Sequence, residues 1–296
     1  GTVTSINYEH VNKLFLPEMK LDPAIRATSE ISEAIDVDAV LLVTPSQHLR
    51  AICENASDTW RSDVPAVICT KGIERGTCAL MSEVVAATLP KAPLAVLTGP
   101  TFAGEVAREL PTAVTLACND ETLGKILLEL MSARCFRIYR SRDVTGAQIG
   151  GTLKNVVAIA CGIVEGRGLG QNARAAIITR GLAEMIRFGV AKGARPETLS
   201  GLTGVGDLTL TCSTKQSRNF SLGFLLGSGK TLTEILKDRV SVAEGVDSAS
   251  SVTELARRIG VETPICEAVD KIINHDANID NIIGRLLSRP LKEEMP

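Results

Sequence analysis

Short apolar runs alternate with amphipathic segments along the first half of the chain. Continuous runs of Val, Ile, Leu and Ala, closed by turn residues, are typical of strands buried in a parallel sheet. The predicted strands are residues 39–43, 66–69, 94–97, 112–117 and 136–139. Helical patterns lie between some of them, at 79–89 and 121–131. Strands that alternate with helices predict an α/β fold with a doubly wound, Rossmann-type sheet.

The second half of the chain loses this alternation and shows longer helical patterns. The predicted helices are residues 148–165, 172–192, 222–227, 231–237, 248–260 and 264–274. The change falls near 143–146. We therefore expect an α/β domain over residues 1–144 and an all-helical domain over 145–296, with a small-molecule site between them.

The start of the chain departs from the usual plan of a dinucleotide-binding sheet. Such a sheet opens with a strand and a G-x-G-x-x-G loop, followed by a helix whose N-terminus holds the pyrophosphate. No such loop occurs in the first residues, up to Leu16 and Pro17. Loss of a central strand would expose apolar surface and unpaired edges. We therefore expect a sequence that is incomplete at its start and lacks the first strand and the glycine-rich loop; the alternative is a different domain that begins here.

Two other glycine-rich segments lack the context of a nucleotide-binding loop. Residues 227–231 resemble the end of a P-loop, but Phe224 stands where the first glycine is needed, and a helix precedes them. Residues 166–170 also follow a helix rather than a strand. We expect helix ends and turns at both places.

Composition narrows the classes of partner. The 296 residues are 45% hydrophobic and 22% charged, with a net charge of −2. This balance is typical of a globular protein and gives no global attraction to nucleic acid or anionic membranes. The stretch 144–164 is apolar, but its glycines, Gln148, Lys154 and Asn155 favour a buried helix over a membrane span.

Cysteines and histidines give no metal-binding pattern. The eight cysteines form no C-x-x-C pair and often lie in apolar runs, as expected for reduced residues of a cytoplasmic protein. His10, His48 and His275 are far apart in the sequence. We expect no metal site and no histidine general base.

Lys154 is the most informative single residue. It lies in the apolar helical stretch. Lysine is almost never fully buried unless it pairs with an acidic group or takes part in the protein's function. Burial beside other cations lowers the pKa of a lysine toward neutrality, where it can accept a proton. The alternative is a lysine whose amine extends from the helix into solvent.

Two polar clusters follow in the helical half. Gly201, Gly204 and Gly206 lead to Asp207, which suggests a tight loop presenting a carboxylate. The segment 213–219 places several hydrogen-bond donors close to Arg218 in the sequence, and this set of residues is suited to binding a phosphate group. The alternative for this second cluster is an ordinary polar loop with a helix cap.

Three residues of the first half lie just beyond predicted strands. Lys71 follows one strand, and Gly99 and Thr101 follow the next. Ligands of open α/β sheets bind beyond the carboxyl ends of the strands. Thr101 would also cap a helix over 102–109 and leave its N–H groups facing an anion.

Several long strings, taken in order, resemble bacterial-type NAD(P)-dependent glycerol-3-phosphate dehydrogenase. They are K-G-I-E (71–74), L-T-G-P-T-F-A-x-E-V-A (97–107), G-G-T-L-K-N-V-V-A-I-A-C-G (150–162), N-A-R-A-A-I-I-T-R-G-L-A-E-M (172–185), G-L-T-G-V-G-D-L-x-L-T-C (201–212), S-R-N (217–219) and V-A-E-G-V (242–246). The resemblance runs from about Leu14 to the last residues. The missing cofactor loop is the one departure.

The resemblance implies a hydride transfer between NADH or NADPH and C2 of dihydroxyacetone phosphate, which gives sn-glycerol 3-phosphate for phospholipid synthesis. By the same resemblance, the catalytic residues would be Lys154, Lys71 and Asp207. The substrate contacts would be Lys71, Gly99, Thr101, Lys154, Asp207, Ser217, Arg218 and Asn219, and the cofactor contacts would be Lys71, Ala103, Arg218, Val242 and Glu244.

The alternatives are a 2-hydroxy-acid or 3-hydroxy-acid dehydrogenase of the same plan, and a binding protein that has lost its cofactor loop. The Ser217–Asn219 cluster argues against the first, because a carboxylate substrate does not need it. The residue that selects NAD or NADP normally follows the second strand of the sheet, so cofactor preference stays open. We expect a cytoplasmic protein, a homodimer through the helical domain, and no nucleic-acid partner.

Overall fold

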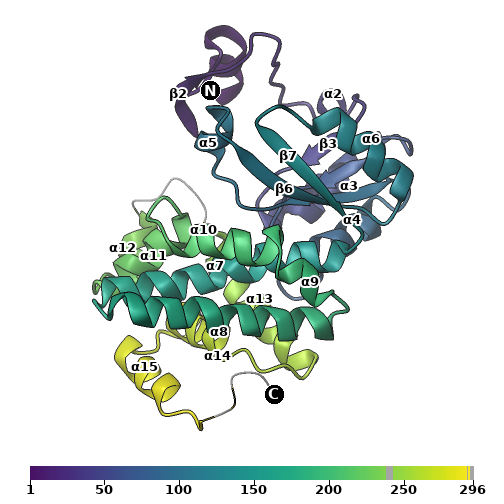
Figure 1. The fold of residues 1–296 in the computed structure, drawn as a ribbon. Helices are drawn as coiled ribbons and strands as arrows, with labels where there is room; N and C mark the ends of the chain where they lie inside the picture. Colours follow the sequence, from purple (N-terminus) through teal and green to yellow (C-terminus); the bar gives the residue numbers. More distant parts are fainter. Residues whose placement is uncertain (238–242, 292, 294–296) are drawn as a thin grey trace.

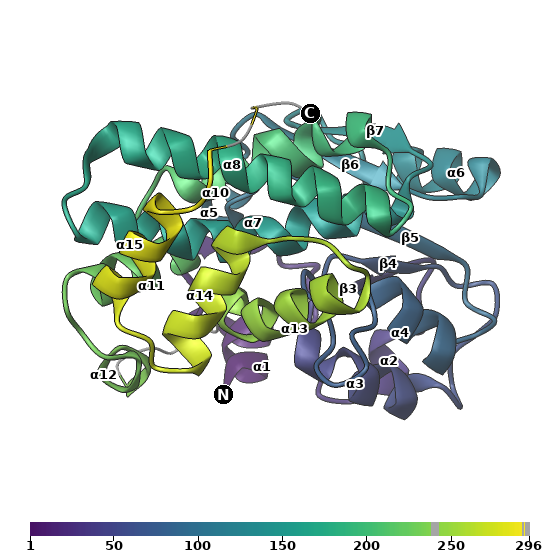
Figure 2. The same cartoon turned by 90° about the horizontal axis from the view of Figure 1, so that it is seen from below.

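The computed structural model describes residues 1–237, 243–291 and 293. Its main parts are a five-stranded sheet with helices on both faces and a body of helices built around one long buried helix (Figure 1). Figure 2 shows the molecule from below, with α13, α14 and α15 of the helical part on the side away from the sheet strands β6 and β7.

The first residues form a small unit of their own. It consists of α1 (Thr2–Thr4), a π-helical turn η1 (Ser5–Glu9), and the antiparallel strands β1 (Val11–Asn12) and β2 (Leu16–Lys20). These two strands do not join the main sheet. The strands predicted from the sequence begin only after this unit, at residue 39.

All five predicted strands are confirmed and lie side by side in chain order. They are β3 (Val40–Leu42), β4 (Ala66–Ile68), β5 (Leu94–Thr98), β6 (Thr112–Ala117) and β7 (Phe136–Ser141). Strands β3, β4 and β5 are parallel, with Val40 opposite Ala66 and Ala66 opposite Leu94. Strand β6 runs antiparallel to β5 and parallel to β7, so the sheet is mixed rather than fully parallel.

The sheet is covered on both faces, as its continuous apolar strands predict. Alternate residues of β4 and β5 enter different cores: Ile68 and Val96 join one with α3 and α4, while Val67 and Ala95 join the other with α6. The helices and turns of this part are α2 (Ile31–Ala34), η2 (Ser46–His48), α3 (Leu49–Ala56), α4 (Met81–Thr88), α5 (Ala103–Ala107) and α6 (Glu121–Met131).

Strand β3 lies at one edge of the sheet. Leu41 within it and Val43 just after it are 50% and 69% exposed. The expectation that a first strand and a glycine-rich loop are missing from the sequence stays a prediction, as does the domain division at residue 144.

The helical part contains every helix predicted for it. Its elements are α7 (Val144–Gly166), α8 (Gly170–Ala191), α9 (Pro196–Leu199), the π-helical turn η3 (Leu202–Gly206), α10 (Asp207–Cys212), α11 (Arg218–Gly227), α12 (Leu232–Lys237), α13 (Glu244–Arg258), α14 (Pro264–Asn274) and α15 (Ile279–Leu287). Three helices begin four residues before their predicted starts: α7 at Val144, α11 at Arg218, after a cap by Ser217, and α13 at Glu244. Both glycine-rich segments are turns at helix ends, as expected, with positive φ at Gly168 and Gly229.

One prediction for the helical part is wrong. The glycine-rich segment before Asp207 is not a tight loop but the helical turn η3, which continues directly into α10. Gly204 packs so closely on the preceding backbone that an added Cβ would stand 1.7 Å from the carbonyl oxygen of Leu199. The glycines therefore allow close packing of a helical turn.

Helix α7 is the centre of the helical core. Every residue from Gly146 to Val164 is buried, and the helix is crossed closely by α11. An added Cβ at Gly162 would approach the carbonyl oxygen of Phe220 at 2.1 Å. α7 is long and apolar enough to cross a membrane by composition, but its most apolar 18-residue stretch is entirely buried inside the protein. This agrees with the predicted buried helix.

Candidate active site

Lys154 is buried, as one reading of the sequence proposed. It lies near the middle of α7 with 6% of its surface exposed. Its Nζ donates to Oδ1 of Asp207 at 2.5 Å and to Oγ1 of Thr211 at 3.0 Å. The alternative of an amine that extends into solvent is therefore wrong, because the ammonium group has buried partners.

Asp207 bridges two lysines from different parts of the chain. Its Oδ2 accepts a hydrogen bond from Lys71 Nζ at 2.9 Å, while Oδ1 faces Lys154. The side chain of Asp207 is 1% exposed. One buried carboxylate thus fixes both amines.

The surroundings lower the pKa of Lys154 to about 7. Burial is the largest cause, because it penalises the charged ammonium, and the positive charge of Lys71 adds to it. Asp207 opposes both effects by attraction and by its hydrogen bond. The net result is an amine that changes protonation near neutral pH.

Lys71 reaches this site from the carboxyl end of the parallel strand β4. Its Nζ also donates to the carbonyl oxygen of Gly99, at the end of β5, at 3.3 Å. The stem of Lys71 lies over Gly151 of α7, where an added Cβ would stand 3.4 Å from Cγ and Cδ. The site therefore lies where the strand ends meet α7, the position expected for ligands of open α/β sheets.

Two buried hydroxyl groups at the ends of β3 and β5 have no hydrogen-bond partner within the described residues. They are Oγ1 of Thr44 and Oγ1 of Thr98. Buried polar groups are nearly always satisfied, so unpaired hydroxyls call for a ligand or water. This edge of the sheet fits a ligand rich in polar atoms, such as a dinucleotide.

Thr101 does not cap a helix, contrary to prediction. Helix α5 begins at Ala103, and its capping residue is Phe102, with no side-chain cap. The hydroxyl of Thr101 instead donates to the carbonyl oxygen of Gly99 at 3.3 Å. Thr101 therefore lies beside the atom that Lys71 contacts.

The polar cluster after α10 is joined to the centre of α7 by a hydrogen bond. Asn219 donates to Oδ1 of Asn155 at 2.9 Å and accepts from the backbone N–H of Gly245 at 3.0 Å. Ser217 accepts from the backbone N–H of Phe220, so the predicted alternative of a helix cap is confirmed. Asn219 thus joins the residue beside Lys154 to the start of α13.

Glu244 lies at the start of α13 and contacts the sheet domain. Its Oε2 accepts a hydrogen bond from Ser46 Oγ at 2.9 Å. Burial raises the pKa of Glu244, while the Ser46 hydrogen bonds and the charge of Arg218 lower it in part. Ala103 is exposed at the start of α5, and Val242 lies outside the described residues.

Two residues of this site were not predicted from the sequence. Thr211 contacts both Lys154 and Asp207, and Ser46 binds Glu244. Thr211 is four residues after Asp207, which places both on one helix face, so a helix prediction there would have found it. Ser46 has no comparable signal, because its partner is 198 positions away.

No group of three or more potential metal ligands occurs among the described residues. Two surface hollows, one between α14 and α15 and one near the start of α6, include neither Lys71 nor Lys154 in their linings. The charged groups brought together at this site are Lys71, Asp207 and Lys154.

Comparison with known proteins agrees with this arrangement. A family model described as NAD-dependent glycerol-3-phosphate dehydrogenase N-terminus matches residues 1–124, and the corresponding C-terminus model matches residues 143–284. A glycerol-3-phosphate dehydrogenase [NAD(P)+] of Caulobacter vibrioides is 54% identical over 99% of this chain and 88% of its own length. One of Rhodospirillum rubrum is 56% identical over 98% of this chain and 83% of its own length.

A crystal structure extends the similarity to three dimensions. Glycerol-3-phosphate dehydrogenase from Coxiella burnetii superposes with a TM-score of 0.93 at 37% identity, and the match covers 97% of this chain and 89% of that one. Sequence and fold agree over nearly the whole chain. The chain therefore belongs to the NAD-dependent glycerol-3-phosphate dehydrogenase family.

Proposed function

We propose that this protein interconverts dihydroxyacetone phosphate and sn-glycerol 3-phosphate with NADH or NADPH, and so supplies glycerol 3-phosphate for phospholipid synthesis. The observation that carries the proposal is the buried Lys154–Asp207–Lys71 cluster at the carboxyl edge of the sheet. Family membership supplies the substrate and the cofactor.

Lys154 would transfer the proton. In its neutral form it accepts the proton of the C2 hydroxyl during oxidation, and in its charged form it returns a proton to the ketone oxygen during reduction. A pKa of about 7 makes both forms available near neutrality. Asp207 holds the amine in place through Oδ1, and Thr211 adds a second contact.

Lys71 would bind and polarise the same oxygen. Its amine is held between Asp207 and the Gly99 carbonyl, so it presents a positive charge where negative charge develops on the substrate oxygen during reduction. The same charge helps to keep the pKa of Lys154 low. The two lysines therefore have different roles in one site.

The remaining predicted residues would contact the phosphate, the rest of the substrate and the cofactor. Arg218, with Ser217 and Asn219 beside it, would bind the phosphate, and Thr101 and Gly99 would contact the substrate. Ala103, Glu244 and Val242 would line the cofactor. The bound nicotinamide supplies or accepts the hydride.

The reaction is tested by following oxidation of NADH and NADPH with dihydroxyacetone phosphate and with unphosphorylated dihydroxyacetone. Turnover that needs the phosphate group supports the proposal. Comparison of the rates with NADH and NADPH gives the cofactor preference of the enzyme. Turnover only with 2-hydroxy-acid or 3-hydroxy-acid substrates would favour the first alternative, and no turnover in folded protein would favour the binding-protein alternative.

We further propose a cytoplasmic homodimer with a sheet domain up to residue 144 and a helical domain after it. All eight cysteines are free thiols, which fits a reducing compartment. The mass measured by light scattering tests the dimer.

A further inference from the structure

A groove between α14 and α15 lies on the far side of the helical body from the sheet (Figures 1 and 2). Residues spaced three and four apart on each helix line it, so each helix contributes one face, and Arg289 adds to the lining from just after the end of α15. The lining residues are Pro264, Glu267, Ala268, Lys271, Ile282, Arg285, Leu286 and Arg289. The hollow holds about 370 Å³ of space, part of it open to solvent.

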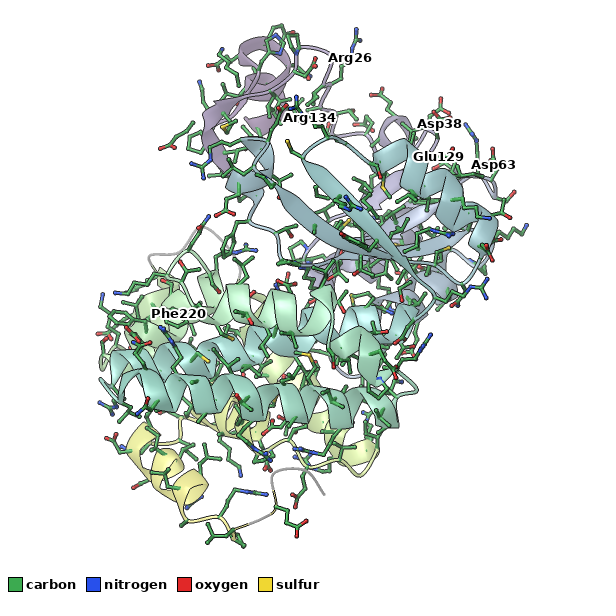
Figure 3. The ribbon with its side chains drawn as sticks, in the orientation of Figure 1. Arg26, Asp38, Asp63, Glu129, Arg134 and Phe220 are labelled. Carbon is green, nitrogen blue, oxygen red and sulfur yellow. The ribbon has the colours of Figure 1, made fainter. Side chains whose placement is uncertain are left out.

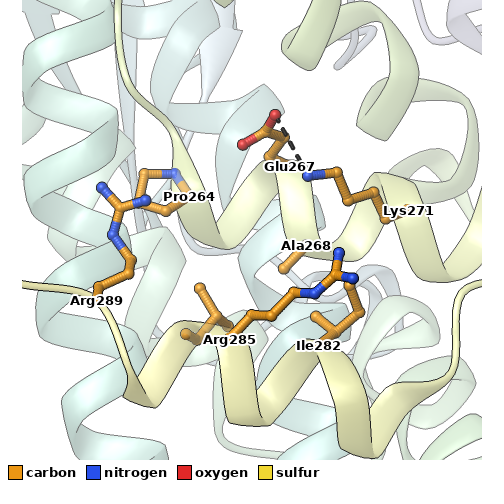
Figure 4. Close-up of a pocket in the computed structure, with 8 residues that line it drawn as sticks. Pro264, Glu267, Ala268, Lys271, Ile282, Arg285 and Arg289 are labelled. Carbon is orange, nitrogen blue, oxygen red and sulfur yellow. Dashed lines mark ion pairs between the residues drawn. The ribbon is translucent and has the colours of Figure 1, made fainter.

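The groove combines an apolar floor with a positively charged rim. Ala268 and Ile282 are buried beneath it, with 8% and 5% of their surfaces exposed. Lys271, Arg285 and Arg289 surround this floor, and Figure 4 shows their cationic ends around the opening. The chain as a whole has a net charge of −2, so this concentration of cations is local.

The positive charge of the rim is only partly neutralised by the protein. Lys271 pairs with Glu267 at 3.6 Å, both side chains being 46% exposed, and such surface pairs contribute little. Arg289 pairs with Glu262 at 3.1 Å. Arg285 has no side-chain hydrogen bond or ion pair within the described residues. One guanidinium group therefore remains available above the apolar floor.

We propose that the α14–α15 groove binds an amphipathic anion, in which a phosphate or carboxylate head contacts Arg285 and an alkyl chain lies on Ala268, Ile282 and Leu286. A guanidinium group binds such heads through two parallel hydrogen bonds. The apolar floor removes part of the alkyl chain from water, which favours binding in proportion to the apolar area buried. This site is separate from the lysine cluster and does not depend on the proposed reaction.

Calorimetric titration of the whole chain with three probes tests the site. Octyl phosphate should bind measurably, inorganic phosphate more weakly because it lacks the chain, and octanol more weakly because it lacks the charge. Octanoate distinguishes a carboxylate head from a phosphate head. Equal affinity for octyl phosphate and octanol would contradict the role of the rim.

Arg285→Ala should weaken octyl phosphate binding by at least about tenfold, because it removes the charge-assisted hydrogen bonds to the head group. The matched control is Arg134→Ala, an exposed arginine on the sheet domain at the opposite end of the molecule (Figure 3). Arg285 is exposed, so its loss should leave the fold intact. Unchanged affinity in Arg285→Ala, or an equal loss in both variants, would overturn the proposal.

Discussion

Asp207 Oδ1 lies 2.5 Å from Nζ of Lys154, and both side chains are almost completely buried. Asp207 is the first residue of α10, and Lys154 lies near the middle of α7. Breaking a buried pair by removing one partner leaves an uncompensated charge, so both groups should be sensitive to substitution. This pair is the basis of the first two predictions.

Lys154→Ala should lower kcat by roughly 10²–10⁴-fold, because it removes the proposed proton donor and acceptor. Binding of dihydroxyacetone phosphate should survive in part, because Lys71 and the proposed phosphate contacts remain. Steady-state kinetics and ligand titration separate the two effects. Lys125→Ala, at an exposed lysine of α6, is the control and should keep its activity. Near-wild-type turnover in Lys154→Ala would refute the assignment.

The pH profile should follow the protonation of Lys154. Oxidation of glycerol 3-phosphate needs the neutral amine, so its kcat/KM should rise as pH passes through about 7, and reduction should decline over the same range. Lys71→Met should move the midpoint upward, because it removes a positive charge that lowers the pKa of Lys154. A midpoint that stays in place in the residual activity of this variant would show that Lys71 does not act on Lys154.

Glu184 should make stability depend on pH. It is 2% exposed on α8 and accepts hydrogen bonds from the backbone N–H groups of Ile265 and Cys266 at the start of α14. Burial raises its pKa from 4.5 to about 7, despite these hydrogen bonds. Because the folded pKa lies above the unfolded value, the contribution of this group to stability should be complete below about pH 4.5. It should be lost as pH rises through about 7, a change of about 3 kcal/mol from this group alone.

Urea unfolding across this pH range measures the effect of Glu184. Glu184→Gln should remove the part of the pH dependence that comes from this carboxyl group, while its amide oxygen can still accept a hydrogen bond. Glu129→Gln, at the exposed glutamate labelled in Figure 3, should leave the dependence unchanged. The same slope in wild type and Glu184→Gln would contradict the prediction.

Gly162→Ala should destabilise the protein by more than about 1 kcal/mol, because its Cβ would stand 2.1 Å from the carbonyl oxygen of Phe220 and force α7 and α11 apart. Gly284→Ala is the control: no heavy atom lies within 4 Å of its added Cβ, and alanine favours the helix. Thermal unfolding should therefore move in opposite directions for the two variants.

The sequence by itself determined the order and type of the main elements. The apolar runs predicted all five sheet strands, and the limits of α6 and α14 agree with those predicted. These predictions succeed because strand and helix periodicities are local, and buried segments show them strongly. The burial of α7 followed from its composition in the same way.

Only the tertiary structure decided how distant residues meet. Lys71 and Asp207 are 136 positions apart, and Ser46 and Glu244 are 198 apart, so no local pattern predicts either contact. The reversal of β6 against β5 and the helical form of the segment before Asp207 also escaped prediction. Gly204 permits a close contact with Leu199, and such contacts depend on packing between elements rather than on local preference. The pKa of Lys154 depends on the same packing, because burial and its charged neighbours arise only when α7, α10 and the end of β4 come together.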